Sequence, residues 1–128
     1  DLEAVDQLVQ KALTVGEDFP YYQYFLMLKG LNALRQKDFN TAIEACEQSR
    51  GRDPAQSFGT VICTNFAIEA QAHHHLGHSE QAAECLTAAQ QLFDTVLPDP
   101  GRVENRSWPD WLIARILYNE ADALINAQ

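Results

Sequence analysis

The sequence predicts an all-α domain over residues 1–128, built as a solenoid of about six antiparallel helices paired into hairpins. The first observation is an internal repeat: an offset of 40 residues places Gly30 on Ala70 and Ala42 on Ala82. A period of about 20–50 residues is typical of solenoids, because each unit must bury its apolar face against the next. The repeat therefore predicts stacked helical hairpins.

The second observation is the spacing of small and apolar residues. Ala42, Cys46 and Ser49 are four and three positions apart, which places them on one face of a helix. The third observation is composition, with 46% hydrophobic and 21% charged residues, as expected of a folded chain. Both observations agree with a helical domain that buries its repeated face.

Residues 2–15 are predicted to form a single helix, in which Val5, Val9 and Ala12 show the same four-and-three spacing. This helix resembles the second helix of a hairpin whose first helix is missing. A complete hairpin follows over 20–51, and we expect Gly51 to end it in a left-handed cap.

The second hairpin is predicted over 56–93, with Gly77 at its turn. Two prolines and a glycine in 95–106 predict a loop. Ser107 is expected to cap a closing helix over 108–126. The two whole hairpins are thus flanked by one unpaired helix at each end.

The two predicted hairpins share small residues at equal spacings and a polar turn. The matching residues are Gly30, Asp38, Phe39, Ala42, Ser49 and Pro54 in the first hairpin, and Ala70, Gly77, Ala82 and Ala89 in the second. This pattern resembles the tetratricopeptide repeat. The departures are Lys37 at the turn glycine, Ser79 at the turn aromatic and Asp94 at the closing proline. The resemblance implies a concave groove that is lined by the first helix of each hairpin.

A narrower resemblance involves residues 72–77, AHHHLG, and 108–125, WPDWLIARILYNEADALI. These segments are similar to the C-terminal helical-repeat regions of planctomycete serine/threonine protein kinases and WD-repeat proteins. The resemblance implies a larger parent protein that phosphorylates proteins, and the first residue, Asp1, also suggests a segment of a longer chain. The sequence itself has no glycine-rich nucleotide loop, His-Arg-Asp or Asp-Phe-Gly motif, so we expect no enzyme activity from it.

The net charge of −9, from 18 acidic and 9 basic side chains, argues against nucleic acid and membrane partners. No apolar run approaches the roughly 20 residues of a membrane span. Three cysteines without CxxC spacing indicate buried thiols in a reducing compartment, which predicts a cytoplasmic location. The expected partner is therefore a protein or peptide.

Four histidines, His73, His74, His75 and His78, are the most chemically suggestive cluster. His74 and His78 are four positions apart, a spacing at which two imidazoles can share a zinc ion on a continuous helix. Gly77 interrupts that helix and no third ligand has suitable spacing, so we predict no metal, cofactor or catalytic residue. A metal-dependent enzyme, or a thiol enzyme using Cys63 or Cys85, remains a remote alternative.

The predicted function is a non-catalytic scaffold for protein binding, as a docking or regulatory segment of a larger signalling protein. The alternative is self-association through the apolar faces of the unpaired end helices. The expected groove is rich in Tyr, Met, Leu and Arg, as protein-binding surfaces are, although these residues would be core if the helical register differed. Its residues are Tyr24, Met27, Leu31, Leu34, Arg35, Gln71, His74, His75, Arg115 and Tyr118.

Overall fold

The computed structural model describes residues 2–14, 16, 21–54, 58–95 and 108–127. These residues form six α-helices and no strand, which confirms the predicted all-α class. The helices are α1 (Leu2–Leu13), α2 (Tyr22–Arg35), α3 (Phe39–Gly51), α4 (Gly59–His75), α5 (Ser79–Thr95) and α6 (Trp108–Ile125). None of these helices is long and apolar enough to cross a membrane.

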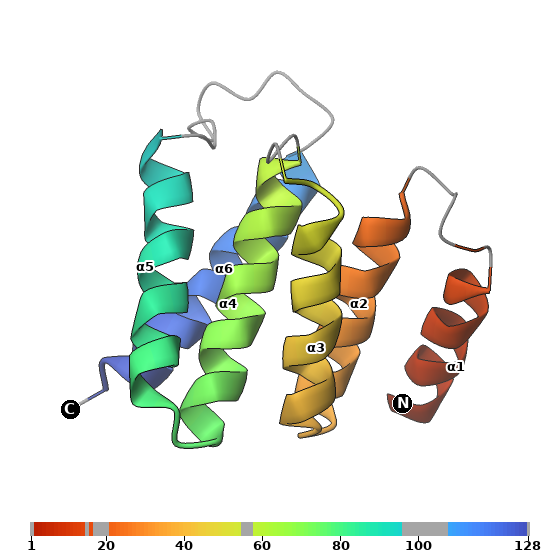
Figure 1. Ribbon diagram of the computed structural model, residues 1–128, viewed down its shortest axis with the longest axis horizontal. Coiled ribbons are helices and arrows are strands. Elements are labelled where there is room, and N and C mark those ends of the chain that lie inside the picture. The colour runs from red at the N-terminus through yellow and green to blue at the C-terminus, as the bar shows by residue number, and fades with distance from the viewer. Residues whose placement is uncertain (1, 15, 17–20, 55–57, 96–107, 128) are drawn as a thin grey trace.

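The first five helices stand side by side in chain order, each packed against the next (Figure 1). The sixth helix departs from this order, because it packs mainly against α4 and much less against α5. The chain is thus a row of two hairpins, α2–α3 and α4–α5, with α1 added at one end and α6 laid across α4.

The observed helices differ from the predicted ones by a few residues at their ends. The first helix ends at Leu13 instead of residue 15, the fourth begins at Gly59 instead of 56, and the fifth continues to Thr95 instead of 93. Residues 96–106 of the predicted loop, and Ser107 as a cap, lie outside the described residues. The last helix ends at Ile125, one residue before the predicted end.

The 40-residue repeat is visible in the turns of the two hairpins. Lys37 has a φ of 64° and Gly77 a φ of 81°, so both turns use the left-handed region at equivalent positions. Glycine reaches this region without strain, whereas a side chain makes it costly. Gly51 was expected to do the same after α3, but it is the last helical residue and Arg52 follows with a φ of −84°. The predicted left-handed cap at Gly51 is wrong.

The small-residue faces predicted from the repeat pack in the core. Ala42, Cys46 and Ser49 are fully buried, and their repeat partners are 0–8% exposed. Gly30 faces this surface so closely that an added Cβ would lie 2.5 Å from the Sγ of Cys46. The helix α2 therefore approaches α3 at a distance that only glycine permits.

Two hydrophobic clusters form the core, and α4 belongs to both. One cluster joins α2, α3 and α4 and includes Leu117 of α6. The other joins α4, α5 and α6 around residues such as Ile62, Leu86 and Ala114. Because α4 is covered from both sides, eleven of its residues are buried. This sharing couples the two hairpins into one folded unit.

Polar groups inside the core set the alignment of three helices. The hydroxyl of Ser49 in α3 donates to the carbonyl oxygen of Gln23 in α2 at 2.6 Å, and accepts from Nδ2 of Asn65 in α4 at 2.9 Å. Buried polar groups are costly unless they find partners, so these bonds favour one relative position of the helices.

A charged pair lies beside this polar chain. Arg50 of α3 binds Glu69 of α4 through two bonds of 2.7 Å, one from Nε and one from Nη2. The Glu69 side chain is 1% exposed and that of Arg50 is 29% exposed. Burial raises the pKa of Glu69, and the guanidinium opposes that shift. The aliphatic and aromatic surroundings include Phe66, whose ring lies 4.4 Å from the guanidinium carbon.

Candidate functional site

The C-terminal helix of the chain itself covers part of the predicted concave groove. Leu117 of α6 packs in the same cluster as Met27 and Leu34 of α2. The helix that follows the first hairpin, α4, packs more extensively on the second helix of that hairpin, α3, than on the first, α2. The helix that follows the second hairpin, α6, does the opposite, because it packs more extensively on α4 than on α5. The closing helix is thus displaced onto the inner face of the stack and occupies part of the place expected for a ligand.

The predicted binding surface is thus partly buried. Met27, Leu34, Gln71 and Tyr118 are only 2%, 6%, 6% and 9% exposed, yet Leu34 and Gln71 still line an open pocket of about 380 Å³ together with Arg35 and His75. The other members of the predicted set remain at least partly accessible. Tyr24, Leu31 and Arg115 are half-buried, and Arg35, His74 and His75 are exposed.

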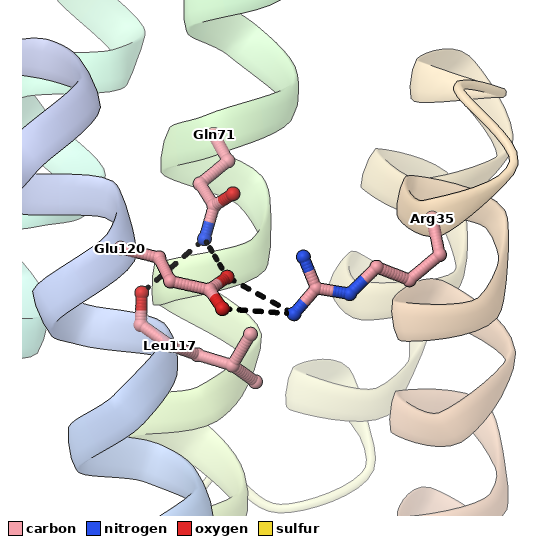
Figure 2. A network of polar contacts seen from close by, with 4 residues as sticks. All are labelled: Arg35, Gln71, Leu117 and Glu120. Atoms are coloured by element: carbon pink, nitrogen blue, oxygen red, sulfur yellow. Dashed lines mark hydrogen bonds and ion pairs between the residues drawn. The ribbon is translucent and has the colours of Figure 1, made fainter.

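A polar network attaches α6 to α2 and α4 (Figure 2). Nη2 of Arg35 lies 3.1 and 3.0 Å from the two carboxylate oxygens of Glu120. Nε2 of Gln71 donates to the carbonyl oxygen of Leu117 at 3.2 Å and to Oε2 of Glu120 at 3.4 Å. Because the Arg35 and Glu120 side chains are 45% and 39% exposed, their ion pair contributes only about 0–1 kcal/mol.

Tyr118 is held on the opposite side of α6 by aromatic and polar contacts. Its ring meets that of Phe93 edge-on, with centroids 5.4 Å apart, and its hydroxyl donates to Oε1 of Gln90. The guanidinium carbon of Arg115 lies 5.0 Å from the Phe93 ring centroid and 5.4 Å from that of Tyr118. Tyr118 and Arg115 therefore fasten α6 to α5.

Tyr118→Ala should lower the free energy of unfolding by roughly 3 kcal/mol, because it removes a buried aromatic ring. Arg35→Ala, which removes only an exposed ion pair, should lower it by less than about 1 kcal/mol. Urea unfolding of both variants measures the difference. Equal midpoints for Tyr118→Ala and the parent chain would contradict the packing described for α6.

The histidine cluster does not converge on a metal site. The close pair is His73 and His78, whose Nδ1 atoms are 3.1 Å apart, and not His74 and His78, whose spacing of four suggested a shared ligand. Burial and the proximity of His78 lower the pKa of His73. The His75 ring instead stacks on Phe39 with centroids 4.7 Å apart. Within the described part of the chain, no three His, Cys, Asp or Glu side chains are placed to hold a metal ion.

The three cysteines are free thiols with environments that suppress reactivity. Cys46 and Cys63 are buried and Cys85 is half-buried. Burial raises the pKa of both Cys63 and Cys85 to about 12. Since the thiolate is the reactive form, these groups are poor nucleophiles at neutral pH.

An open surface with a more apolar lining lies between α1 and α2. We call it the N-terminal groove, and its volume is about 420 Å³. Leu8 and Val5 of α1 are 68% and 44% exposed, and Phe25 and Leu28 of α2 face the same space. The full lining is Val5, Leu8, Val9, Ala12, Phe25, Leu28, Leu31, Asn32 and Arg35.

Asn32 provides the polar feature of the N-terminal groove. Its Nδ2 donates to Oδ1 of Asp6 at 3.0 Å, which connects α2 with α1. Its Oδ1 is buried and has no hydrogen-bond partner among the described residues. A buried amide oxygen left in this state costs free energy.

The sequence contained a partial signal for the N-terminal groove. The unpaired first helix predicted an apolar face without a neighbour, and of the predicted inward residues Val9 is buried whereas Val5 is exposed. Leu8 was missed, although it lies three positions after Val5 and four before Ala12 and so shares their helical face. Of the predicted site residues, the structure brings only Leu31 and Arg35 to this groove.

Comparison with known proteins yields one distant similarity. The chain is 25% identical over 122 residues to a protein-lysine N-methyltransferase, SMYD4, of Gallus gallus. The match covers 95% of the chain but only 14% of the length of that protein. No protein-family model matches the chain. No solved structure matches it either.

Proposed function

We propose that the chain is a non-catalytic protein-interaction module whose binding site is the N-terminal groove. The supporting observation is the large exposure of Leu8 and Val5 beside Phe25 and Leu28, a contiguous apolar surface on an otherwise acidic chain. Apolar patches of this kind mark binding sites on proteins that otherwise keep such residues inside. The inner face proposed from the sequence is the weaker candidate, because α6 covers part of it and the pocket that remains has a mixed polar lining of Leu34, Arg35, Lys37, Phe39, Gln71 and His75.

The repeat favours an amphipathic α-helix as the occupant. In the first hairpin, α2 packs against both α3 and the following helix α4. If the same arrangement held one hairpin earlier, a helix equivalent to α2 would pack against both α1 and α2. That position is the N-terminal groove. Helix-in-groove binding uses apolar anchors at i, i+3, i+4 and i+7.

The wider context of this module also belongs to the proposal. The chain acts as a docking or regulatory segment of a larger signalling protein, such as a bacterial serine/threonine kinase, in a reducing cytoplasm. Three free thiols support a reducing environment. The chain spans only 14% of the methyltransferase relative, so the catalytic activity of that protein gives no reason to propose catalysis here.

Leu8→Glu tests the proposal, because it places a charge in the N-terminal groove at a position that is 68% exposed. We expect stability to change by less than about 0.5 kcal/mol, as at ordinary surface positions. Affinity purification with the parent chain as bait should capture proteins that Leu8→Glu loses. The matched control is Ala83→Glu on the exposed side of α5, which should capture the same proteins as the parent chain. Identical capture by all three baits would refute the assignment.

A further inference from the structure

The pocket that remains open on the inner face lies at the turn of the first hairpin. We call it the inner pocket, and its volume is about 380 Å³. The end of α2, the turn into α3 and the end of α4 form it, with the lining residues Leu34, Arg35, Lys37, Phe39, Gln71 and His75. Among the described residues that line it, three are basic and none is acidic, although the chain has a net charge of −9. The inner pocket therefore concentrates basic side chains on an acidic protein.

Lys37 occupies the inner pocket at a conformational cost. Its φ of 64° lies in the left-handed region, where a side chain is unfavourable, and the equivalent residue of the second hairpin is Gly77. The Lys37 side chain is exposed, and within the described residues its ammonium group has no hydrogen bond or ion pair. The described contacts thus give this lysine no structural role, and residues in such backbone conformations cluster at functional sites.

Arg35 and His75 add further donors to the inner pocket. Both bonds from Arg35 to Glu120 use Nη2, so Nε and Nη1 remain for another acceptor (Figure 2). A guanidinium group presents its N–H donors in a planar fork that binds phosphate oxygens in pairs. The His75 ring is held by stacking on Phe39, with centroids 4.7 Å apart. A ligand in the inner pocket therefore meets donors from α2, from the turn and from α4.

We propose that the inner pocket binds a phosphorylated side chain of a partner protein. A phosphoryl group has three acceptor oxygens and a charge of about −1.5 to −2 at neutral pH, which suits donors that come from three elements. A carboxylate has a single charge, and the one that Glu120 provides pairs with Arg35 and leaves Lys37 unpaired. The net charge of −9 disfavours polyanions such as nucleic acid and anionic membranes. The proposal goes beyond the N-terminal groove and does not depend on it.

Glu120 is an internal competitor for this ligand. Its carboxylate lies 3.0 Å from Nη2 of Arg35, so its charge opposes an anion that approaches the same guanidinium. Glu120→Gln removes that charge and keeps an amide oxygen that can accept from Nε2 of Gln71. We therefore expect Glu120→Gln to bind a phosphorylated ligand about threefold more tightly than the parent chain.

Isothermal titration calorimetry tests the proposal with two acetylated and amidated pentapeptides, Gly-Gly-X-Gly-Gly, in which X is phosphoserine or phosphotyrosine. At least one of them should bind the parent chain, and it should bind at least about tenfold more tightly than inorganic phosphate or the same peptide with glutamate at X. Binding of neither phosphopeptide would overturn the proposal. Equal affinity for the glutamate peptide or for inorganic phosphate would also overturn it, because the pocket would then accept a carboxylate or a free ion.

The lysine variants assign the binding to the inner pocket. Lys37→Gln should weaken binding of the phosphopeptide about tenfold, since it removes a charged donor. The matched control is Lys11→Gln, which makes the same change in net charge at an exposed position of α1 and should bind like the parent chain. Leu8→Glu, which alters the N-terminal groove, should also bind normally. Equal losses in Lys37→Gln and Lys11→Gln would indicate a general effect of charge and overturn the assignment.

Lys37→Gly separates binding from folding. Glycine is the residue of the equivalent turn, so the melting temperature should not fall, whereas the affinity for the phosphopeptide should fall as in Lys37→Gln. Circular dichroism melting and calorimetry of the same samples measure the two effects. A lower melting temperature with unchanged affinity would show that Lys37 serves the fold and would overturn the proposal.

Discussion

Gly30→Leu should destabilise the domain by about 3 kcal/mol, a large part of the 5–15 kcal/mol that typical domains have. A Cβ at this position would lie 2.5 Å from the Sγ of Cys46 and 3.3 Å from the carbonyl oxygen of Ala42. The obstruction includes backbone, so α2 and α3 would have to separate. Thermal and urea unfolding of the variant measure the loss.

Three further variants separate this overpacking from the general effect of adding side chains to helical glycines. Gly51→Ala should be neutral or slightly stabilising, since an added Cβ there meets nothing within 4 Å and alanine favours helix. Gly30→Ala should lose about 1–3 kcal/mol, and the additional change Cys46→Ala should restore part of it by removing the nearer obstruction. If Gly30→Leu melts like the parent chain, the close approach of α2 to α3 is wrong.

Arg50→Met should cost about 3–5 kcal/mol, because it leaves the Glu69 carboxylate buried without its cation. The two bonds of 2.7 Å from Arg50 stabilise the charge of a side chain that is 1% exposed. The guanidinium lowers the pKa of Glu69 while burial raises it, so the pKa of Glu69 should rise further in the variant. Urea unfolding at neutral pH measures the cost.

The pH dependence of Arg50→Met distinguishes a buried charge from lost packing. A carboxyl group whose folded pKa lies above its unfolded pKa binds protons more tightly when folded, so protonation favours folding. The deficit of the variant should therefore shrink as pH falls toward the ordinary range of glutamate. The double change Arg50→Met with Glu69→Leu should recover most of the stability, because it replaces both charges with apolar groups. A deficit that is constant with pH and persists in the double variant would refute this account.

The hairpins could be predicted from sequence because their determinants are local and repeated. The spacing of Ala42, Cys46 and Ser49 and its return at Ala82 indicate which faces pack, and the helices follow from that pattern. The conformational preferences of single residues are a weaker guide. Lys37 adopts the same left-handed turn conformation as Gly77, although this conformation favours glycine.

The position of α6 could not be predicted in the same way. Its sequence is apolar on several sides, including Leu112 and Ile116 outside and Leu117 and Ala121 inside. Such a pattern predicts a helix but does not identify the neighbour that it covers. The inner face was therefore predicted to be open, and Met27 and Leu34 were interpreted as ligand contacts.

Glu69 was detectable in sequence but was overlooked. It is the only Asp, Glu, Lys or Arg among the seventeen residues of α4, and its neighbours Ile68 and Ala70 are apolar. A lone carboxylate in a helix of this kind indicates a buried partner of opposite charge. The identity of that partner, Arg50, depends on the packing of α3 and is visible only in the fold.

The weak attachment of α1 has a consequence for the energetics of the N-terminal groove. Among the side chains of α1 that the structure describes, Val9 is the one buried apolar side chain, whereas α4 contributes to both core clusters. Local opening of α1 would therefore cost far less than global unfolding and would leave α2–α6 intact. One wall of the groove is thus the helix that we expect to open locally most readily. Any occupant must pay part of its binding free energy to hold that wall closed, so changes that stiffen α1 would tighten binding without touching the ligand.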